Sequence, residues 1–396
     1  MNFKKVMAAV LAGTMVFGMA SSVSAATEVS FWTLNTRQNA VEPIVEAFNE
    51  ANPDIKVTAS FYDTDGIKDA CKVAASSDTL PSMWFNWGGS LGSFYVDNDK
   101  TYDLTQYAKD NGWNDEFTEA ALDLCTFDNK LSGYPTSYNA LGVYYSKQIF
   151  DDCGIEVPTT FDEFEAALKT LKDNGYTPMD TAGLNGWHVM RWLELLVEHY
   201  AGAELHDKLN TFEESWDCEA VVQAFTKYKE WVDAGYFPDG FLTLDPNDTI
   251  MAMGTGECAM DLQGQWYDGT MIQNDLDPND YGVFAFPSGD SNRMSAFAEM
   301  TQFNKNLSDE ELDACVKFMD YYYSDDSVDQ YGEYYNLPLP KQGKKAPADQ
   351  VNVDGMLETS NTNGTFTITD QAFPTEVADV LFNAQDAVAI EEYQAK

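Results

Sequence analysis

Residues 28–61 hold the pattern that most constrains the fold, because an amphipathic helix lies between two extended segments. The segment EVSFWTL at 28–34 indicates a first strand, and apolar residues alternate with polar ones from 55 to 61, as in a second strand. Between them lies a stripe at helical spacing, made by Val41, Ile44, Val45 and Phe48. Two strands joined in this way form a βαβ unit, which builds parallel sheets covered by helices. The chain is therefore predicted to be an α/β protein.

Residues 129–172 contain a second ordered pattern: an extended segment, a break, another extended segment and a helix. Pro135 predicts that the first of these strands ends there, because proline cannot continue a central strand. Residues 141–145 alternate as a strand does, and Thr160 with Glu163 forms a capping box that starts the helix. The pattern predicts two separate strands followed by a capped helix.

These motifs resemble a known family in their order and spacing. The extracellular solute-binding proteins of ABC importers, the maltose-binding-protein-like group, have the series G-K-L-Y-G-L-P, Y-Y-N-K and P-x-T-W-x-E-F. This chain has a similar series: NKLSGYP at 129–135, YYSK at 144–147 and PTTFDEF at 158–164. The segments AFNEANPDIKV, LPSMWFNWGG, ECAMDLQGQW and YGVFAFPSGD also resemble that family, although Ser82 replaces its usual acidic residue. The resemblance implies a two-lobed periplasmic binding protein fold of type II with three interlobe crossings.

The resemblance also implies where the two lobes begin and end. Crossings are expected within residues 129–172, at 296–305 and at 336–343. Lobe 1 is then expected to comprise residues 26–138 plus 298–335, and lobe 2 residues 139–297 plus 336–396. A chain that crosses between two lobes leaves a cleft, and a cleft that closes can hold a ligand.

The first 25 residues have the features of a signal peptide. Lys4 and Lys5 precede an apolar stretch that is too short to span a bilayer comfortably, and the segment ends in the small residues Ser24 and Ala25. We therefore expect an exported protein, periplasmic or at the extracellular cell surface. No lipid-attachment cysteine stands in this region, in contrast to many Gram-positive members of the resembled family.

The charge balance restricts the partners of the chain. It has 65 acidic and 23 basic residues, a net charge of −42, which argues against nucleic acid and anionic membranes because both require clustered cations. A solubilising surface explains this acidity, and a cationic ligand such as a polyamine is the alternative. The six cysteines show no CxxC or zinc spacing, so free thiols and disulfides both remain open.

Signatures of common enzymes are missing from the sequence. It contains no GxSxG elbow, no P-loop and no HExxH motif, and its three histidines are predicted to be structural or surface residues. The stretches DPNDT at 245–249 and DPNDY at 277–281 lack the ligand spacing of a calcium loop and predict turns instead. We expect no catalytic residue, no metal and no cofactor. A glycosidase needs two carboxyl groups across the scissile bond, and the sequence does not single out such a pair.

Aromatic residues next to polar ones carry the strongest functional signal. A sugar ring packs its C–H face against an indole or phenol ring, and its hydroxyls need hydrogen-bonding groups with fixed directions. Residues that combine these features at proposed strand ends and crossings are the predicted ligand-binding set: Trp32, Asn35, Arg37, Trp84, Asn86, Trp87, Tyr138, Asn139, Trp187, Arg191, Asp261, Gln263, Gln265, Trp266 and Glu299. The remaining large indoles, Trp113, Trp192, Trp216 and Trp231, are predicted to belong to the core or to helix surfaces.

The sequence thus predicts the sugar- or oligosaccharide-binding component of an ABC importer, with the ligand held between two lobes. The resemblance implies a membrane permease with ATP-hydrolysing subunits as partner, and we expect a monomer. Three alternatives remain: the same fold with a polyamine or another solute, a secreted glycoside hydrolase, and a surface lectin.

Overall fold

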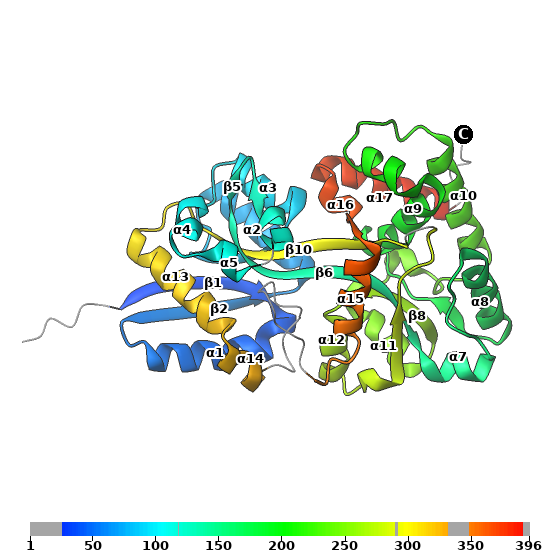
Figure 1. The fold of residues 1–396 in the computed structure, drawn as a ribbon, viewed down its shortest axis with the longest axis horizontal. Coiled ribbons are helices and arrows are strands. Elements are labelled where there is room, and N and C mark those ends of the chain that lie inside the picture. The colour runs from blue at the N-terminus through cyan, green and yellow to red at the C-terminus, as the bar shows by residue number, and fades with distance from the viewer. Residues whose placement is uncertain (1–25, 118, 290–291, 332–347, 391–396) are drawn as a thin grey trace, which may run out of the picture.

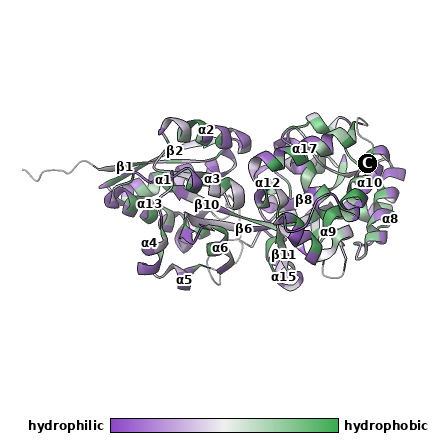
Figure 2. Ribbon diagram, turned by 90° about the horizontal axis from the view of Figure 1, so that it is seen from above, coloured by the Kyte–Doolittle hydropathy of each residue, from purple (hydrophilic) through white to green (hydrophobic). Residues whose placement is uncertain are grey.

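The computed structural model describes residues 26–117, 119–289, 292–331 and 348–390, which form two α/β halves (Figure 1). Two long antiparallel strands, β6 (Gly133–Ser146) and β10 (Met294–Phe303), run from one half into the other. Seen from above, these strands join the two halves (Figure 2). The predicted α/β class is confirmed.

The first half contains the N-terminal strands and the helices that surround them. Its elements are β1 (Thr27–Leu34), α1 (Gln38–Ala51), β2 (Ile55–Tyr62), α2 (Thr64–Ser77), β3 (Met83–Trp87), α3 (Gly89–Asp97), α4 (Thr105–Asp110), α5 (Trp113–Glu116), α6 (Glu119–Leu124), β4 (Thr126–Phe127), β5 (Lys130–Leu131), α13 (Asp309–Tyr322) and α14 (Asp325–Tyr331). β1 pairs with β2 in parallel along its whole length, beginning with Thr27 opposite Ile55. The predicted βαβ unit is confirmed, and α1 buries Val41, Ile44 and Phe48 of its apolar stripe.

The second half is larger and takes up the C-terminal helices. Its elements are α7 (Lys147–Cys153), α8 (Phe161–Asp173), β7 (Thr177–Met179), α9 (Trp187–Asn210), α10 (Glu219–Asp233), α11 (Thr249–Thr255), β8 (Cys258–Gly264), α12 (Tyr267–Gln273), β9 (Tyr281–Phe284), α15 (Val353–Asn363), β11 (Thr365–Thr367), α16 (Thr369–Ala372) and α17 (Thr375–Ala389). The main sheet runs through both halves in the order β2-β1-β3-β10-β6-β8-β7, with β9 beside β6 and β11 beside β10. The predicted capping box is present at the start of α8, where Thr160 and Glu163 cap each other's backbone.

The predicted strand break at Pro135 is wrong, because β6 is one continuous strand of 14 residues. The register against β10 shifts at this point: Ser137 lies opposite Glu299, whereas Pro135 lies opposite Met300. The residue between them is left out of the ladder, which makes a β-bulge. A bulge tolerates a residue that has no N–H to donate, so the proline marks an irregularity within the strand. Two expected crossings correspond to β6 and β10, and the third, at 336–343, lies outside the described residues.

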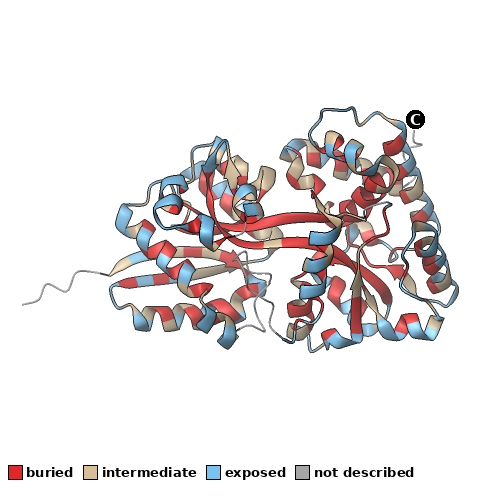
Figure 3. Ribbon diagram, viewed as in Figure 1, coloured by how far each residue is buried: buried red, intermediate tan, exposed pale blue. Residues whose placement is uncertain are grey.

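One apolar cluster lies in the first half, and a larger one extends from α2, β3 and α3 of the first half into the second half. The shared strands are buried almost along their whole length (Figure 3). Phe48, Trp113 and Phe318 belong to the core of the first half. Trp192 and Trp231 belong to the core of the second half, as predicted for them and for Trp113. Trp216 is half-buried and packs edge-on against the ring of Phe373.

Histidines, cysteines and Asp-Pro turns take structural roles in the described residues. His206 Nδ1 lies 2.7 Å from Glu198 Oε2, and the ring of His199 stacks on Phe161 at a centroid distance of 3.9 Å. All six cysteines are free thiols. The predicted turns are confirmed, because Asp245 and Asp277 each accept a hydrogen bond from the backbone N–H two residues later.

Candidate functional site

A cavity of about 450 Å³ lies between the two halves, and both contribute to its walls. The first half supplies the residues that follow β1 and β2 and the end of β3, whereas the second half supplies the start of α9, the end of β8 and α12. Seven of the predicted ligand-binding residues line this cavity: Asn35, Trp87, Trp187, Arg191, Gln263, Trp266 and Glu299. The lining also includes amides and hydroxyls that we did not predict, namely Thr36, Thr64, Asn247, Thr249, Thr270, Gln273 and Asn274.

A smaller hollow of about 50 Å³ shares part of the same wall. It has Trp87, Trp187 and Arg191 in common with the large cavity and adds Lys68 and Asp370. The two halves are close together here, because α3 of the first half contacts α16 of the second. Gly89 is required at this approach, since it has a φ of +59° and an added Cβ would lie 2.3 Å from a backbone oxygen of α16.

Three indole rings and two cations alternate along the wall. Lys68 Nζ lies 5.0 Å from the ring centroid of Trp87 and 5.8 Å from that of Trp187. The guanidinium carbon of Arg191 lies 4.5 Å from the ring of Trp187 and 5.4 Å from that of Trp266. Cations over indole faces are attracted by the ring quadrupole, so these contacts fix the spacing of the three rings.

The indole of Trp266 lies close to its own strand, which needs a residue without a side chain beside it. A Cβ on Gly264 would lie only 1.9 Å from this ring, and the ring of Phe297 approaches it at a centroid distance of 5.6 Å. The sequence GQW at the end of β8 therefore sets the ring against the strand and toward the cavity.

A buried polar network supports the wall behind Arg191. Arg191 Nη1 donates to the carbonyl of Leu262 and to Gln263 Oε1, both at 3.3 Å. Gln263 Nε2 donates to Asp261 Oδ2 at 3.0 Å, and Tyr267 donates its hydroxyl to the same oxygen at 2.9 Å. Asp261 is fully buried. Burial alone raises the pKa of its carboxyl group, but the hydrogen bond and the charge of His188 have the larger effect, so this pKa lies below its usual value. Asp261 therefore sits behind the cavity as an acceptor that orients Gln263 and Tyr267.

Glu299 reaches the cavity from β10 and is held by two partners. Arg37 Nη2 lies 2.6 Å from Glu299 Oε2, and the Ser137 hydroxyl donates to the same oxygen. Burial lowers the pKa of Arg37, but the nearby Glu299 charge outweighs it and raises that pKa above its usual value. Arg37, predicted to bind ligand, instead lies behind Glu299 with its guanidinium over the ring of Phe85.

The structure does not bring the other predicted residues to the lining of the cavity. Trp84 and Asn86 lie in β3, a central strand that is buried on both faces; Trp84 packs against Tyr95, and Asn86 donates to Gln302 Oε1 at 2.8 Å. Trp32 packs against Tyr62 at a centroid distance of 5.1 Å. These three residues lie within strands and pack against neighbouring side chains, whereas the prediction made them ligand contacts at strand ends.

Tyr138 and Asn139 were also expected to face a ligand, and the structure places them in β6 between β10 and β8, with Asn139 buried and Tyr138 half-buried. The hydroxyl of Tyr138 lies 2.7 Å from that of Thr365, and Asn139 donates to the Ser137 hydroxyl at 3.0 Å. Gln265 is fully buried and accepts a hydrogen bond from the backbone of β6. With Asp261, these side chains hold the strands together behind the cavity wall.

Asp63 lines the large cavity and Lys68 the smaller hollow, and the sequence prediction included neither. Asp63 follows β2 and caps α2, because its Oδ1 accepts a hydrogen bond from the N–H of Gly66 at 2.6 Å. In parallel sheets the strands end at one edge, where ligands bind at a change in strand order. The positions after β1, β2 and β3 meet at this edge, so the strand order would have pointed to Asp63 as well as to Asn35 and Trp87.

The rims of the two halves touch directly. Asn185 Nδ2 donates to Asp65 Oδ2 at 2.5 Å, and the Thr64 hydroxyl donates to Asn247 Oδ1 at 3.3 Å. Ser90 of α3 donates to the carbonyl of Asp370 in α16 at 3.2 Å. The cavity is therefore enclosed by contacts from both sides.

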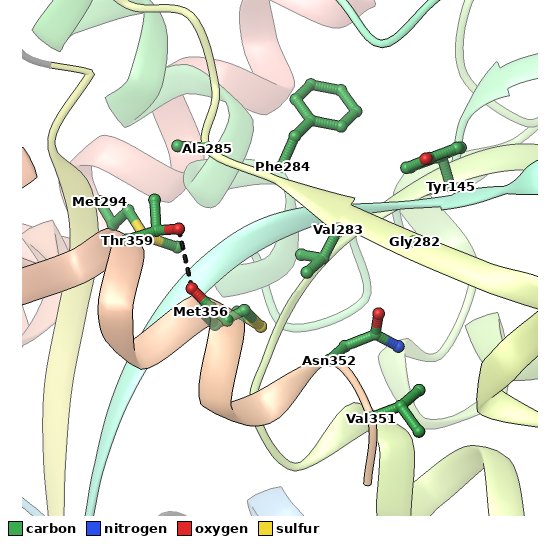
Figure 4. Close-up of a pocket in the computed structure, with 11 residues that line it drawn as sticks. Tyr145, Gly282, Val283, Phe284, Ala285, Met294, Val351, Asn352, Met356 and Thr359 are labelled. Atoms are coloured by element: carbon green, nitrogen blue, oxygen red, sulfur yellow. Dashed lines mark hydrogen bonds between the residues drawn. The ribbon is translucent and has the colours of Figure 1, made fainter. Parts of the chain in front are cut away.

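A separate hollow of about 320 Å³ lies within the second half, between β9 and α15 (Figure 4). Val283, Met294 and Met356 are among the residues that line it, and its lining contains no charged side chain and no indole. The amide of Asn352 is already held by Asp268 Oδ1 at 2.9 Å. This hollow lacks the indole rings and the charged side chains that line the interlobe cavity.

The sequence matches a model of the bacterial extracellular solute-binding protein family over residues 33–329. The chain belongs to this family. It is 27% identical over 250 residues to an uncharacterized ABC transporter extracellular-binding protein of Pyrococcus horikoshii, a match that covers 62% of this chain and 56% of that protein. It is also 23% identical to the multiple sugar-binding protein of Streptococcus mutans over 328 residues, which covers 76% of this chain and 72% of that one.

Solved structures of solute-binding proteins share the two-lobed fold. A chitin oligosaccharide binding protein superposes with a TM-score of 0.83 at 22% identity, with 93% of this chain and 95% of that chain covered. The maltose-bound MalE3 of T. maritima superposes with a TM-score of 0.79 at 18% identity, with coverage of 93% and 96%. The predicted fold and family are confirmed. In the described part of the chain, no helix is long and apolar enough to cross a membrane, and no cluster of His, Cys, Asp or Glu is arranged to hold a metal ion.

Proposed function

We propose that this protein is the extracytoplasmic sugar-binding component of an ABC importer, with a sugar or oligosaccharide bound between the two lobes. The observation that carries this proposal is the arrangement of Trp87, Trp187 and Trp266 along one cavity together with amide groups from both halves. Indole faces offer stacking to the C–H side of a sugar ring, and amides both donate and accept hydrogen bonds to its hydroxyls. The sugar-binding relatives support the same substrate class.

The two-walled cavity also suggests how the protein signals that it is loaded. A ligand that contacts both walls binds better when the halves are together, so it shifts the population toward the closed arrangement. Contacts such as Asp65–Asn185 would then form the rim of the closed state. The partner that recognises this state would be the permease of the importer, which carries its own ATP-hydrolysing subunits.

We further propose the lobe boundaries expected from the sequence, residues 26–138 plus 298–335 and residues 139–297 plus 336–396. The change of halves along β6 and β10 supports them, and the family supports export behind a signal peptide at residues 1–25. We propose that the protein is a monomer. We also propose that it does not bind nucleic acid, because its net charge of −42 repels the phosphate backbone.

The same site argues for binding without catalysis and against a polyamine. The carboxylates of Asp63, Asp245 and Glu299 line the cavity, but each accepts hydrogen bonds from neighbouring groups of the chain. A polyamine site would combine carboxylates with few amides, whereas this wall contains several amides and the cation of Arg191.

The test is a thermal-shift screen of the mature protein against neutral and acidic mono- and oligosaccharides. We expect at least one saccharide to raise the melting temperature, to change tryptophan fluorescence and to reduce the radius measured by small-angle scattering. If no saccharide in a broad panel shifts the melting temperature while a polyamine or another solute does, the sugar assignment is wrong.

A further inference from the structure

Arg191 is a buried cation in the cavity wall without a carboxylate in ion-pair contact among the described residues. The chain has three arginines, and the other two are paired: Arg37 with Glu299 at 2.6 Å, and Arg293 with Glu198 at 2.9 Å. Arg191 is only 6% exposed, and burial lowers its pKa to about 10. A buried charge without a partner costs free energy, so its presence in a ligand cavity calls for an explanation.

The guanidinium of Arg191 is fixed in one orientation. The rings of Trp187 and Trp266 lie near it, and Nη1 is held by Leu262 and Gln263. The edge of the guanidinium formed by Nε and Nη2 has no hydrogen-bond partner within the described ranges. Two adjacent N–H groups of a guanidinium fit the two oxygens of a carboxylate in a bidentate pair.

The acidic groups nearest to Arg191 have other partners or sit outside ion-pair distance. Asp261 accepts from Gln263 and Tyr267, and Glu194 Oε2 accepts from a backbone N–H of α16 at 2.8 Å. Burial raises the pKa of Glu194 to about 8 and raises that of Asp370 as well, which favours their neutral forms. The other cation beside the smaller hollow, Lys68, pairs with an aspartate of its own helix at 3.0 Å.

We propose that the ligand is an acidic saccharide, and that a carboxylate of a uronic acid unit binds the free Nε–Nη2 edge of Arg191 while sugar rings stack on the indoles of the cavity wall. This inference rests on the sugar-binding function proposed above and narrows its substrate class. A neutral saccharide needs only the rings and amides of the wall. A buried, oriented guanidinium without an ion-pair partner, in a chain with a large excess of negative charge, provides a feature that distinguishes an acid from its neutral counterpart.

The test compares each acidic ligand with its own methyl ester, which removes the charge and keeps the sugar rings. Short galacturonate and glucuronate oligosaccharides and their methyl esters are titrated into the protein by isothermal calorimetry. We expect at least one acid to bind about tenfold or more tightly than its ester, because a charge-assisted bidentate pair is stronger than a neutral hydrogen bond. The comparison uses the unaltered protein, so it does not depend on a variant that folds.

Variants then assign the preference to one residue. Arg191→Gln should reduce the acid-to-ester ratio to near one, Arg191→Lys should retain part of it, and Arg293→Gln, which alters an arginine outside the cavity lining, should leave it unchanged. Equal affinity for acids and esters, or binding of neutral saccharides alone, would overturn the acidic substrate class and leave the sugar-binding function standing. If neither acids, esters nor neutral saccharides bind, both proposals fail.

Discussion

On the side of the first half, the cavity wall at Asp63 and Trp87 has hydrogen bonds between neighbours in sequence, whereas the opposite wall depends on residues far apart in the chain. Asp63 caps the helix that begins beside it, and Asn86 accepts a hydrogen bond from the N–H of the next residue, Trp87. In the second half, Arg191 is held by Gln263 and His188 contacts Asp261, each pair separated by more than 70 positions.

This difference has an energetic consequence. A local cap forms with one turn of helix and contributes about 1 kcal/mol, so its loss is confined to that turn. A buried network contributes through several mutually dependent hydrogen bonds, and the loss of one member leaves the others unsatisfied in a low-dielectric interior. The second wall should therefore be the more sensitive of the two to single substitutions.

The largest effect is expected for Asp261→Ala, which removes the acceptor shared by Gln263, Tyr267 and His188. Breaking a fully buried charged network of this kind should lower the free energy of unfolding by about 3–5 kcal/mol. Guanidinium denaturation at neutral pH measures it, with Glu46→Ala on the exposed face of α1 as control. A loss below about 1 kcal/mol would show that the second wall is no more interdependent than the first.

A smaller effect, on binding alone, is expected for Trp266→Ala. Loss of a central aromatic contact should weaken saccharide binding by about 2 kcal/mol, with little change in stability because the ring is only partly buried. Trp231→Ala is the matched control: Trp231 is 1% exposed in the core of the second half, so its loss should destabilise the protein and leave the affinity of the folded fraction unchanged. Calorimetric titration of both variants separates the two roles, and equal affinity losses would remove Trp266 from the site.

The sequence predicts well what is local. The capping box of Thr160 and Glu163 and the Asp-Pro turns depend on residues a few positions apart, and the βαβ unit lies within one continuous segment, residues 27–62. Trp87, Trp187 and Trp266, which line the cavity, were included in the prediction because each stands at an end of a strand or helix, beside a glycine or a polar residue. Residues at the ends of strands and helices border the spaces between these elements, so they line a cavity in many arrangements of the elements.

The predicted residues that do not line the cavity, and the predicted strand break, depend on the position of a strand in the sheet. Trp84 was predicted to bind ligand, but β3 lies between β1 and β10 and both of its faces are covered. Arg37 is of a residue type that often contacts ligands, but here it pairs with Glu299, which lies 262 positions away in the sequence. Pro135 indicated a strand end because the bulge that accommodates it is defined only by the register of β10. Long-range pairing of this kind leaves no pattern in a single sequence.

Stability should fall with rising pH because of Asp180, which follows β7 behind the second wall. Burial and the Asp261 charge raise the pKa of Asp180 to about 9, above its value in the unfolded chain. The folded protein therefore binds more protons than the unfolded chain between about pH 4 and pH 9, so its stability decreases across this window, by at most about 1.4 kcal/mol per pH unit for one group. Unfolding free energies from pH 5 to 8 should show a flatter slope in Asp180→Asn than in the unaltered protein. An identical slope in both would show that Asp180 is ionised in the folded state.

The smallest effect is expected in the first wall, for Asp63→Ala. This substitution removes the N-cap of α2 and should lower the free energy of unfolding by about 1 kcal/mol, whereas Asp63→Asn keeps an acceptor for the N–H of Gly66 and should cost little. Both variants remove a carboxylate from the cavity lining, so the pair separates a structural role from a ligand contact. If affinity for the saccharide falls equally in both while stability falls only in the alanine variant, Asp63 contacts the ligand through its charge. If affinity follows stability, the first wall contributes at this position through helix capping alone, and the contrast with Asp261 holds.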